Sequence, residues 1–327
     1  MTIMIGTLQV NDPVFLAPMS GITDQAFRKV VSDLGLPLVT SETIASGEVL
    51  RANQRTIKMM EMGDDGQPLI MQLAGHDPVA MAEVAKMNEA CGVAILDINM
   101  GCPAKKVVNK YCGSALMREP GLARNIMRAV VNAVSIPVTL KMRLGWDSDS
   151  LNAPEFARMA EQEGIQLITV HGRTRMQKYK GSADWASLRA VKESTRLPLI
   201  VNGDIISFDS IDKALHQSGA DGIMIGRGAL GRPWFLIQAM HYLKTGKHFG
   251  RPDMAQRHSI MRQHLAGLVE RYGDPEGARN ARKHMGWYAN FLPNSQTFRQ
   301  SIYRAERADQ MFSVMDQYFS SDSALAA

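Results

Sequence analysis

The sequence contains few cysteines and no long apolar run. Three cysteines among 327 residues are too few for a disulfide framework, and no uncharged stretch approaches the length of a membrane span. No positively charged segment followed by an apolar one opens the chain, so no secretion leader is indicated. We therefore expect a cytoplasmic protein of a reducing compartment that has no membrane partner.

A large charge excess, internal repeats and low-complexity linkers are absent as well. The formal net charge of +5 permits a polyanionic partner but does not demand one. We find no repeat apart from an alternation of strands and helices, and we expect no metal site. At 327 residues the chain is long for one domain, which indicates one large domain and one smaller one.

Short apolar runs alternate with helical segments over residues 14–230. Each run has a polar or glycine-rich exit, and the eight runs are 14–19, 37–43, 68–74, 93–99, 137–142, 167–170, 198–201 and 222–225. Helix starts are indicated by Asp24, by Asp77 with Pro78, and by Ser207, whose helix ends at Gly219. The pattern predicts a (β/α)8 TIM barrel, an α/β fold. An open doubly wound sheet is the alternative, and the count of eight favours closure.

The strand signal stops after residues 234–243, and residues 245–252 have the composition of a linker. Three helices are predicted beyond it, at 254–272, 275–292 and 297–319, separated by turn residues at 273–274 and 293–295. We therefore divide the chain into a catalytic barrel domain, residues 1–244, and a small helical-bundle domain, residues 245–327.

Basic charge is concentrated in this helical domain. Nine lysines and arginines lie between residues 257 and 307 against four acids, so this segment alone carries +5. Aromatic residues are interleaved with them, among them Trp287, Tyr288, Phe291 and Tyr303. A solvated helix face over an aromatic core would have the same composition. As a group, however, these residues are typical of a surface for a nucleic-acid backbone, and we assign contact with nucleic acid to Arg279, Arg282 and Lys283.

Residues 95–103 begin as an apolar strand and end in groups that carry chemistry. Gly101 lets a ligand approach the backbone, and Pro103 fixes the exit of the strand. The amide of Asn99 and the thiol of Cys102 would thus be held on a stiff support. A buried strand that ends at an ordinary cysteine is the alternative, because cysteine is often buried. The endings of the other strands favour the chemical interpretation.

In a parallel barrel the carboxyl ends of the strands form the active site, so the strand ends can be considered as a set. All but the second end in an amide, a cation, a thiol or bare glycine backbone. In chain order these groups are Pro18, Met19 and Ser20; Gln72; Asn99 and Cys102; Lys141 and Arg143; His171, Arg173 and Arg175; Asn202, Gly203 and Asp204; and Gly226, Arg227 and Gly228.

The last two strand ends suit a phosphate group. Loops in this position of a β/α barrel commonly bind phosphate through backbone N–H groups. Gly203, Gly226 and Gly228 supply close backbone, and Arg227 supplies a cation that can donate two hydrogen bonds. Residues 226–231 also match a dinucleotide-binding fingerprint. We regard that match as accidental, because neither a βαβ unit nor an acidic residue about 20 positions later follows it.

Lys141 has three interpretations: a structural lysine, a Schiff-base nucleophile as in barrel aldolases, or a cation against a cofactor ring. An aldolase has no need of Gln72, Asn99 and Asn202 together, whereas these amides suit a heterocycle with imide edges. Flavin mononucleotide (FMN) fits the whole set, with its phosphate at the last two strands and its ring near the amides and Lys141. His171 is either a cofactor contact or a buried core histidine.

Six motifs closely resemble those of the tRNA-dihydrouridine synthase family, and the bacterial B type is the nearest match. They are APMSGITD at residues 17–24, DINMGCPAKK at 97–106, GSAL at 113–116, LKMR at 140–143, HGRTR at 171–175 and NGDI at 202–205. The resemblance covers nearly the whole chain, and the block at 99–106 is highly specific.

The resemblance implies a flavin barrel joined to a helical tRNA-binding domain, in which FMN and NADPH serve to reduce particular uridines of tRNA. It makes Cys102 the proton donor, whereas Cys112 stands at a position where a small apolar residue is expected and inherits no role. Cys91 is expected to pack in a helix. The flavin is placed on Pro18, Met19, Ser20, Gln72, Lys141, Asn202, Gly203, Asp204, Gly226 and Arg227, and we add His171 to the cofactor contacts.

In the implied reaction, NADPH reduces the flavin and hydride passes to C6 of a uracil that is stacked on the ring. Charge then builds on C5 and O4, so an acid must stand on the opposite face, which suits the thiol of Cys102. Asn99 is assigned to the uracil edge, and Arg143, Arg173 and Arg175 to negative charge or a nearby phosphate. The target base must be extruded from folded tRNA, which explains a second domain that grips the RNA.

Two other functions fit part of the pattern. A dihydroorotate-dehydrogenase-like flavoprotein shares the barrel, the flavin and a cysteine that acts on a pyrimidine, but it has no use for a basic helical domain. A non-catalytic RNA-binding barrel is opposed by the intact Cys102, Lys141 and Arg227. We expect a monomer whose partner is tRNA.

Overall fold

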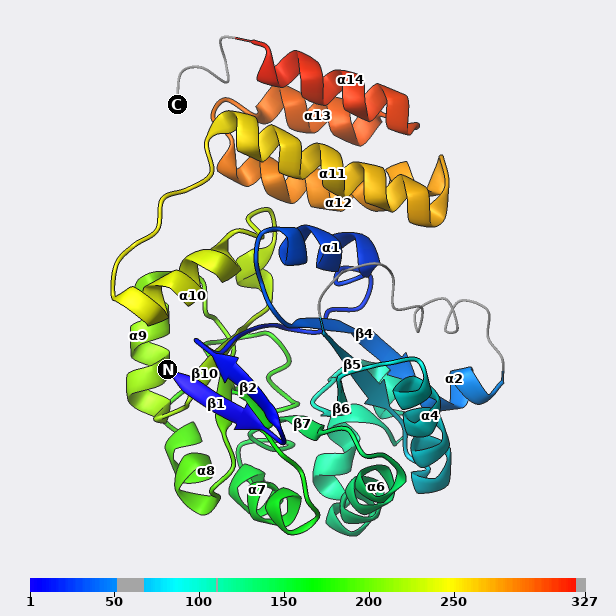
Figure 1. Cartoon of the computed structure of the whole chain (residues 1–327), viewed down its shortest axis with the longest axis vertical. Coiled ribbons are helices and arrows are strands. Elements are labelled where there is room, and N and C mark those ends of the chain that lie inside the picture. The colour runs from blue at the N-terminus through cyan, green and yellow to red at the C-terminus, as the bar shows by residue number, and fades with distance from the viewer. Residues whose placement is uncertain (52–67, 110, 322–327) are drawn as a thin grey trace.

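Eight parallel strands with helices between them form a barrel, and a bundle of helices lies beside it (Figure 1). The structure, a computed structural model, describes residues 1–51, 68–109 and 111–321, with backbone alone at 105 and 106. The barrel strands are β3 (Val14–Leu16), β4 (Val39–Ala45), β5 (Leu69–Ala74), β6 (Ile95–Met100), β7 (Val138–Arg143), β8 (Ile168–His171), β9 (Leu199–Asn202) and β10 (Gly222–Ile225).

Hydrogen-bonded pairing runs in the order β3-β10-β9-β8-β7-β6-β5-β4, and every pair in this sheet is parallel. The two end strands, β3 and β4, also contact each other, so the sheet nearly closes on itself. The predicted barrel is therefore confirmed, and the open doubly wound sheet is excluded because its two edges would lie apart.

Helices surround the barrel, and the predicted helix starts are confirmed. Asp24 accepts a hydrogen bond from the N–H of Phe27 at the start of α1, and Ser207 caps α9 in the same way through Ser210. These caps satisfy N–H groups that have no partner in the first helical turn. The helices are α1 (Gln25–Asp33), α2 (Ser46–Leu50), α4 (Pro78–Ala90), α5 (Lys105–Val108), α6 (Pro120–Ala133), α7 (Ala153–Gln162), α8 (Leu188–Ser194), α9 (Phe208–Ser218) and α10 (Phe235–Thr245), with short turns η1 (Gly113–Arg118) and η2 (Arg227–Ala229).

An antiparallel hairpin that the sequence analysis missed precedes the barrel. Its strands are β1 (Thr2–Ile5) and β2 (Leu8–Asn11), and its buried residues Ile3, Ile5 and Val10 belong to one cluster with residues of the barrel strands such as Phe15 and Ile200. The alternation of exposed and buried residues along β1 is the signal that could have identified it. The hairpin adds apolar contacts that lie away from the polar strand ends.

Side chains two residues apart on a strand face the same side, and this period places the polar groups inside the barrel. The parallel registers pair Gln72 with Asp97, Asn99 with Lys141, and Arg143 with His171. Apolar residues between them, such as Leu96, Ile98, Leu140 and Met142, belong to the large cluster that also contains residues of the surrounding helices. The barrel thus has an apolar outer layer and a polar interior at the carboxyl ends of its strands.

The helical bundle consists of four α-helices and one short turn, not three helices. They are α11 (Met254–Tyr272), α12 (Glu276–Tyr288), η3 (Ala289–Phe291), α13 (Gln296–Arg304) and α14 (Ala308–Phe319). The single helix predicted at 297–319 is wrong because the chain is extended at Ala305 and at Arg307. Arg282 donates to the carbonyl oxygen of Ala305, and Asp274 accepts from the N–H of Ala308. The break is thus held by distant residues and carries no glycine or proline.

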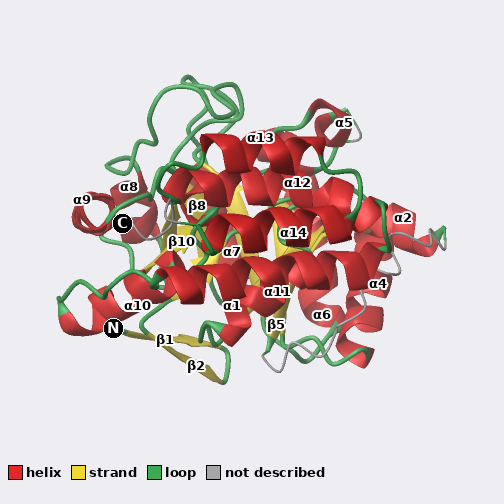
Figure 2. Ribbon diagram, turned by 90° about the horizontal axis from the view of Figure 1, so that it is seen from above, coloured by secondary structure: helices red, strands yellow, loops and turns green. Residues whose placement is uncertain are grey.

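The bundle and the barrel share a layer of contacts at α1. Figure 2, viewed from above, shows the bundle helices lying over the part of the barrel that contains α1. Ala26 and Val30 of α1, together with Trp234, belong to the apolar cluster of the bundle, whereas Phe27 and Val31 of α1 belong to that of the barrel. Helix α1 therefore has one face in each core.

Candidate active site at the carboxyl ends of the strands

A connected set of amides and a carboxylate lies on β5, β6 and β4. The amide nitrogen of Gln72 donates to Asp97 over 2.7 Å, and its oxygen accepts from Asn99 over 2.7 Å and from the hydroxyl of Thr43. Asp97 also accepts from Thr139 over 2.7 Å. Burial raises the pKa of Asp97, and its two hydrogen bonds and the Lys141 charge act in the opposite direction. Sequence reasoning identified Gln72 and Asn99 but gave no role to Asp97, Thr43 or Thr139.

Asn99 fixes the loop that carries Cys102. Its side-chain oxygen accepts from the N–H of Gly101 over 3.0 Å and from that of Cys102 over 2.9 Å. The carbonyl oxygen of Cys102 accepts from the N–H and the hydroxyl of Ser114, over 3.1 and 2.9 Å. Since Asn99 also donates to Gln72, its amide is engaged within the protein, and the thiol of the half-buried Cys102 is the reactive group that the loop presents.

Lys141 and Asn202 form a polar pair on β7 and β9. The ammonium nitrogen of Lys141 donates to the side-chain oxygen of Asn202 over 3.1 Å, and the amide of Asn202 donates to the carbonyl of Met224 over 2.8 Å. Burial lowers the pKa of Lys141 to about 8, and the nearby Arg143 charge lowers it as well, whereas Asp97 and Cys102 oppose this shift. An anion at this place would stabilise the charged lysine.

Arg143 ties two loops together. Its side chain is buried and donates to the carbonyl oxygen of Gly101 over 2.7 Å and to those of Thr174 and Lys178 over 2.9 Å each. Burial lowers the pKa of this guanidinium to about 10. Sequence reasoning assigned Arg143 to the substrate, but the three recorded acceptors are backbone carbonyls. Arg143 thus holds the Cys102 loop through the carbonyl oxygen of Gly101.

Arg173, Asp204 and Arg227 form an ion-pair chain across β8, β9 and β10. Arg173 is 1% exposed and donates to both oxygens of Asp204, over 2.5 and 3.0 Å, and to the carbonyls of Lys180 and Gly181. Arg227 donates to Asp204 over 3.1 Å, with 55% of its side chain exposed. Burial raises the pKa of Asp204, but the bonds from Arg173 and Ala183 and the two arginine charges outweigh this and lower it. Of the two cations that pair with Asp204, Arg227 is therefore the exposed one. Arg173 is the buried one, and it holds Asp204 in place.

His171 is surrounded by positive charge. Burial, followed by the charges of Arg143, Lys141, Arg173 and Arg227, lowers its pKa well below the ordinary value for histidine. Its ring nitrogen Nε2 lies 3.3 Å from a nitrogen of Arg173. His171 is thus a neutral imidazole at neutral pH, and the cations around it provide a strong field for an anionic ligand.

Two glycines shape the phosphate end of the predicted flavin site. Gly203 has φ +112, and a Cβ there would lie 2.7 Å from the ring of His171, so glycine is required for the backbone itself. Gly226 has a negative φ, and a Cβ there would lie 3.4 Å from Ala17 and 3.6 Å from the sulfur of Met19. A Cβ at Gly226 would therefore make ordinary van der Waals contacts, so the space beside its backbone has room for that atom.

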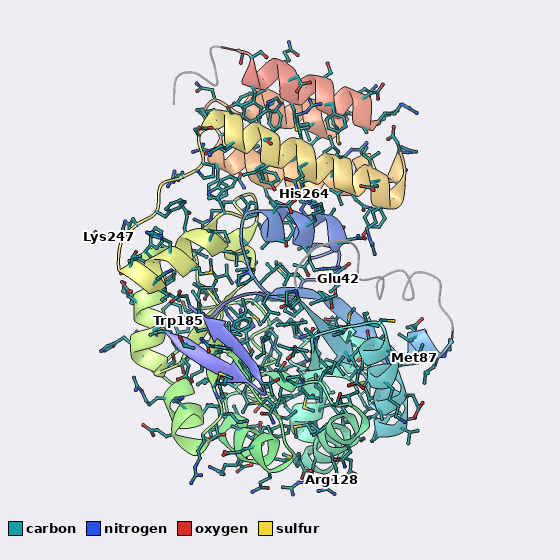
Figure 3. The ribbon with its side chains drawn as sticks, in the orientation of Figure 1. Glu42, Met87, Arg128, Trp185, Lys247 and His264 are labelled. Atoms are coloured by element: carbon teal, nitrogen blue, oxygen red, sulfur yellow. The ribbon has the colours of Figure 1, made fainter. Side chains whose placement is uncertain are left out.

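The loop after β3 lies next to this space and is held from two sides. Pro18 and Met19 are half-buried and Ser20 is exposed. The next residue, Gly21, donates its N–H to the carboxylate of Glu42 and accepts a hydrogen bond at its carbonyl from the ammonium group of Lys283. Figure 3 labels Glu42 just below α1. Lys283, which the sequence analysis assigned to RNA, thus has an acceptor in the barrel.

The other cations of the helical domain that were assigned to RNA differ in their surroundings. Arg282 donates twice to the carbonyl of Ala305, over 3.0 and 2.7 Å. Arg279 is exposed and pairs with Glu276 one turn earlier, an interaction that water and salt weaken. Direct RNA contact by Arg282 or Lys283 would require those bonds to break, whereas Arg279 could contact RNA with little cost.

Aromatic residues at the mouth of the barrel were missed by sequence reasoning. Tyr179 is 58% exposed, and its ring centre lies 5.6 Å from the guanidinium carbon of Arg143 and 5.4 Å from that of Arg227. Trp146 lies between Arg118 and Arg175, with guanidinium carbons 4.8 and 4.5 Å from its ring centre. The alternation of aromatic and basic residues in the loops after β7 and β8 was the available signal.

The other two cysteines lie outside the network around Asn99. Cys112 has its sulfur 3.6 Å from Nδ1 of His76. Cys91 is exposed at the end of α4, so the expectation that it packs within a helix is wrong. The helix ends at Ala90, and the thiol follows its last turn.

A membrane-spanning helix and a cluster of metal ligands are both absent from the described ranges. None of the helices placed there is long and apolar enough to cross a membrane. Residues 1–51, 68–109 and 111–321 contain no group of three or more His, Cys, Asp or Glu side chains that could hold a metal ion.

Comparison with known proteins gives matches over almost the full chain. The dihydrouridine synthase (Dus) family model matches residues 15–322. The chain is 50% identical over 301 residues to a probable tRNA-dihydrouridine synthase of Rickettsia bellii, covering 92% of each protein. It is 42% identical over 318 residues to tRNA-dihydrouridine synthase B of Pseudomonas aeruginosa, covering 97% of this chain and 96% of that protein.

Solved structures resemble the chain at the level of the fold. A morphinone reductase in complex with tetrahydroNAD has a TM-score of 0.54 at 11% identity and covers 78% of this chain and 93% of its own. A 2-naphthoyl-CoA reductase in complex with 2-naphthoyl-CoA has a TM-score of 0.58 at 13% identity and covers 73% of this chain and 51% of its own. At such low identity the likeness concerns the fold alone.

Proposed function

The chain belongs to the dihydrouridine synthase family, and from this premise we propose that it reduces the C5=C6 bond of particular uridines in tRNA to 5,6-dihydrouridine. It would do so as a flavin-dependent oxidoreductase with NADPH as the reductant. The observation that carries the proposal is the loop of Cys102, held by Asn99 at the carboxyl edge of the barrel beside Lys141 and Asn202.

The residues of the barrel mouth fit a flavin, and we propose FMN. The bare backbone of Gly226 and the exposed cation of Arg227 suit a single terminal phosphate, with Gly203 and Asp204 shaping the adjoining backbone. Pro18, Met19 and Ser20 line the same edge. The surplus of cations around the neutral His171 suits an anionic cofactor, because a bound negative charge would relieve their mutual repulsion.

The polar interior of the barrel would hold the ring. Lys141 donates to an amide in the protein and keeps further N–H groups for a ligand acceptor. Gln72 is held by Asp97, Thr43 and Asn99, so its orientation is fixed before any ligand binds. When bound, the reduced flavin supplies the hydride that is added to C6 of the uracil.

Cys102 would act as the acid. Addition of hydride at C6 leaves negative charge at C5 and O4, and the S–H of Cys102 gives its proton to C5, so that the product gains one hydride and one proton. Asn99 and Ser114 hold the backbone on both sides of the thiol, which restricts the positions that the sulfur can take. Asn99 acts in this account as a positioning residue.

The substrate base would have to leave the RNA stack to enter this mouth. Extrusion costs a few kcal/mol of stacking and pairing, which contacts to the surrounding RNA must offset. We propose that the helical domain and the rim of the barrel supply those contacts, with Arg175 and Arg279 among them. We further propose that the protein acts as a monomer in the cytoplasm, where its tRNA substrate is found.

The test is to purify the protein, identify any released cofactor and measure product. We expect a yellow protein that releases FMN on denaturation and that forms dihydrouridine, detected by mass spectrometry, in tRNA that lacks the modification when NADPH is added. Free uridine and dihydroorotate are the control substrates and should remain unchanged. A colourless protein that takes up no added FMN, or turnover of dihydroorotate instead of tRNA, would overturn the proposal.

A further inference from the structure

Two arginines lie over the ring of one tryptophan at the rim of the candidate site. Trp146 follows β7, Arg175 follows β8, and Arg118 ends η1, the turn that begins beside the Cys102 loop. The guanidinium carbons of Arg118 and Arg175 lie 4.8 and 4.5 Å from the centre of the Trp146 ring. Three separate segments thus converge on one cationic and aromatic cluster.

The two arginines of this cluster have no carboxylate partner in the part of the chain that the structure describes. The Nε atom of Arg175 is buried without a hydrogen-bond partner, and one of its terminal nitrogens contacts only the sulfur of Met176. Asp147, the acid next to Trp146, accepts from the N–H of Asp149 instead. Two like charges held against one ring favour a shared anionic ligand.

Four other cations at the barrel mouth and on the bundle are engaged within the protein. Arg143 and Arg173 are buried against carbonyls and Asp204, and Arg282 and Lys283 donate to backbone carbonyls. Arg118 is exposed and Arg175 half-buried, so both can be reached from solvent. Basic residues interleaved with an aromatic ring have the chemistry that binds a nucleic-acid backbone and stacks on a base.

We propose that Arg118, Trp146 and Arg175 form a binding site for the RNA backbone next to the extruded uridine. The two arginines bind phosphate oxygens, and the Trp146 ring holds both guanidinium groups in place. The inference rests on the proposed function, because it takes the substrate to be RNA that enters the barrel mouth. It adds a contact close to the chemistry, where extrusion of the base must be offset.

The salt dependence of tRNA binding tests the site. Each phosphate contact releases bound counterions, so loss of one contact reduces the slope of log K against log salt by about one unit. We expect this reduction for Arg118→Gln and for Arg175→Gln, and about two units for the double variant, in filter binding of unmodified tRNA. Arg118→Lys with Arg175→Lys should keep most of the slope, because the charge is retained.

Arg158→Gln is the matched control, because Arg158 is exposed on α7 at the outside of the barrel, and its slope should equal that of the wild type. Flavin content and the thermal midpoint show that each variant is folded. In turnover, the Gln variants of Arg118 and Arg175 should raise KM for tRNA, whereas Arg158→Gln should leave it unchanged.

The outcomes separate the inference from the function on which it rests. An unchanged slope in the folded double variant would overturn the site, even if the wild type forms dihydrouridine. A reduced slope with no dihydrouridine in any sample would leave the RNA site supported and reject the proposed reaction.

Discussion

At the scale of single residues, the barrel mouth shows how side chains of one type take different roles. Asn99 and Asn202 both end strands, yet Asn99 accepts from two N–H groups of the Cys102 loop, whereas Asn202 accepts from Lys141. Both amides also donate inside the barrel, so neither is left unsatisfied. Because both amides are bound within the protein, the Cys102 thiol is the reactive group next to these hydrogen bonds.

Replacement of Cys102 by alanine tests its role as the acid. We expect Cys102→Ala to keep bound flavin and its reduction by NADPH, because the thiol is needed only when C5 accepts a proton. Dihydrouridine formation should fall by a factor of about 10²–10⁴, the usual contribution of a positioned general acid. Rapid-mixing absorbance of the flavin and mass spectrometry of the tRNA measure the two steps separately.

The exposed Cys91 provides the matched control, and Cys91→Ala should behave as the wild type in both steps. Cys112→Ala should also keep product formation, because the Cys112 sulfur lies near His76, and Asn99 holds the loop of Cys102 instead. Normal product formation by Cys102→Ala together with its loss in Cys112→Ala would show that the other thiol is the acid.

Sequence alone identified most polar residues of the site but not what each one contacts. Lys141, Asn202 and Asp204 were found because each ends a parallel strand, and parallel strand ends meet at one edge. The partners of Arg143, Arg173 and Lys283 could not be found in this way, because all three side chains bind backbone carbonyls, and Arg173 binds Asp204 in addition. Every residue has a backbone carbonyl, so the residue types do not show which carbonyl accepts a hydrogen bond. The sequence therefore does not distinguish a buried arginine bound to carbonyls from an exposed one.

At the scale of elements, the alternation of residues along the strands explains why the barrel could be predicted. An apolar run of about four to eight residues that ends in polar residues indicates a strand in a parallel sheet. The strands predicted from these runs differ from the observed ones by a few residues at their ends. The break between α13 and α14 was missed because its cause is a pair of hydrogen bonds from Arg282 and to Asp274. Such tertiary bonds are not encoded in local composition.

The contact between α1 and the bundle contains two buried histidines. His264 of α11 and His284 of α12 have ring centres 4.5 Å apart, and the Phe27 ring of α1 lies 5.5 Å from the first and 6.1 Å from the second. Figure 3 labels His264 where the bundle faces α1. Burial lowers the pKa of His264 to about 4, and burial, with the neighbouring His264 and Lys283, lowers that of His284 well below its ordinary value.

Acid should therefore destabilise this contact. Both histidines are neutral in the folded protein, whereas the unfolded chain binds protons as pH falls below about 6.5. Stability should be constant above about pH 7 and should decrease between pH 6.5 and 4, by roughly 3 kcal/mol for His264 alone at the acid end. Urea unfolding monitored across this range measures the effect.

His284→Gln removes one of these titrating groups and should make the decrease with acid shallower. His216→Gln is the control, because His216 is exposed in α9, and its pH profile should match that of the wild type. Equal profiles for the wild type and His284→Gln would show that the buried histidines do not govern acid stability.

At the scale of the whole molecule, barrel and bundle meet through backbone as well as side chains. A Cβ at Gly231, just after η2, would lie 2.1 Å from the carbonyl oxygen of Trp287 in α12, so the two backbones are in direct contact there. Lys283 of α12 binds the carbonyl of Gly21, whose N–H is held by Glu42 of β4. The bundle thus supports the loop of Pro18, Met19 and Ser20, which borders the proposed flavin.

A chain that ends at Gly246 tests the division into domains of residues 1–244 and 245–327. The large apolar cluster of the barrel contains no residue of the bundle, so we expect a folded barrel that binds FMN. It should be less stable than the full chain, because Ala26 and Val30 of α1 lose their cover. Exposure of Val30 alone costs about 1.5 kcal/mol or more, and each kcal/mol lowers the thermal midpoint by about 2–4 °C in a domain of this size.

Binding of tRNA to this shortened chain shows how the two parts share the RNA. We expect weaker affinity and a smaller salt slope than in the full chain, but not a slope of zero, because Arg118 and Arg175 remain at the rim. Val30→Gln in the shortened chain is the companion variant, since it makes the uncovered face of α1 polar and separates poor solubility from poor binding.

Equal affinity and slope in short and full chains would mean that the bundle only supports the barrel. Failure of both short chains to fold would mean that barrel and bundle are one cooperative unit, because helix α1 belongs to both cores.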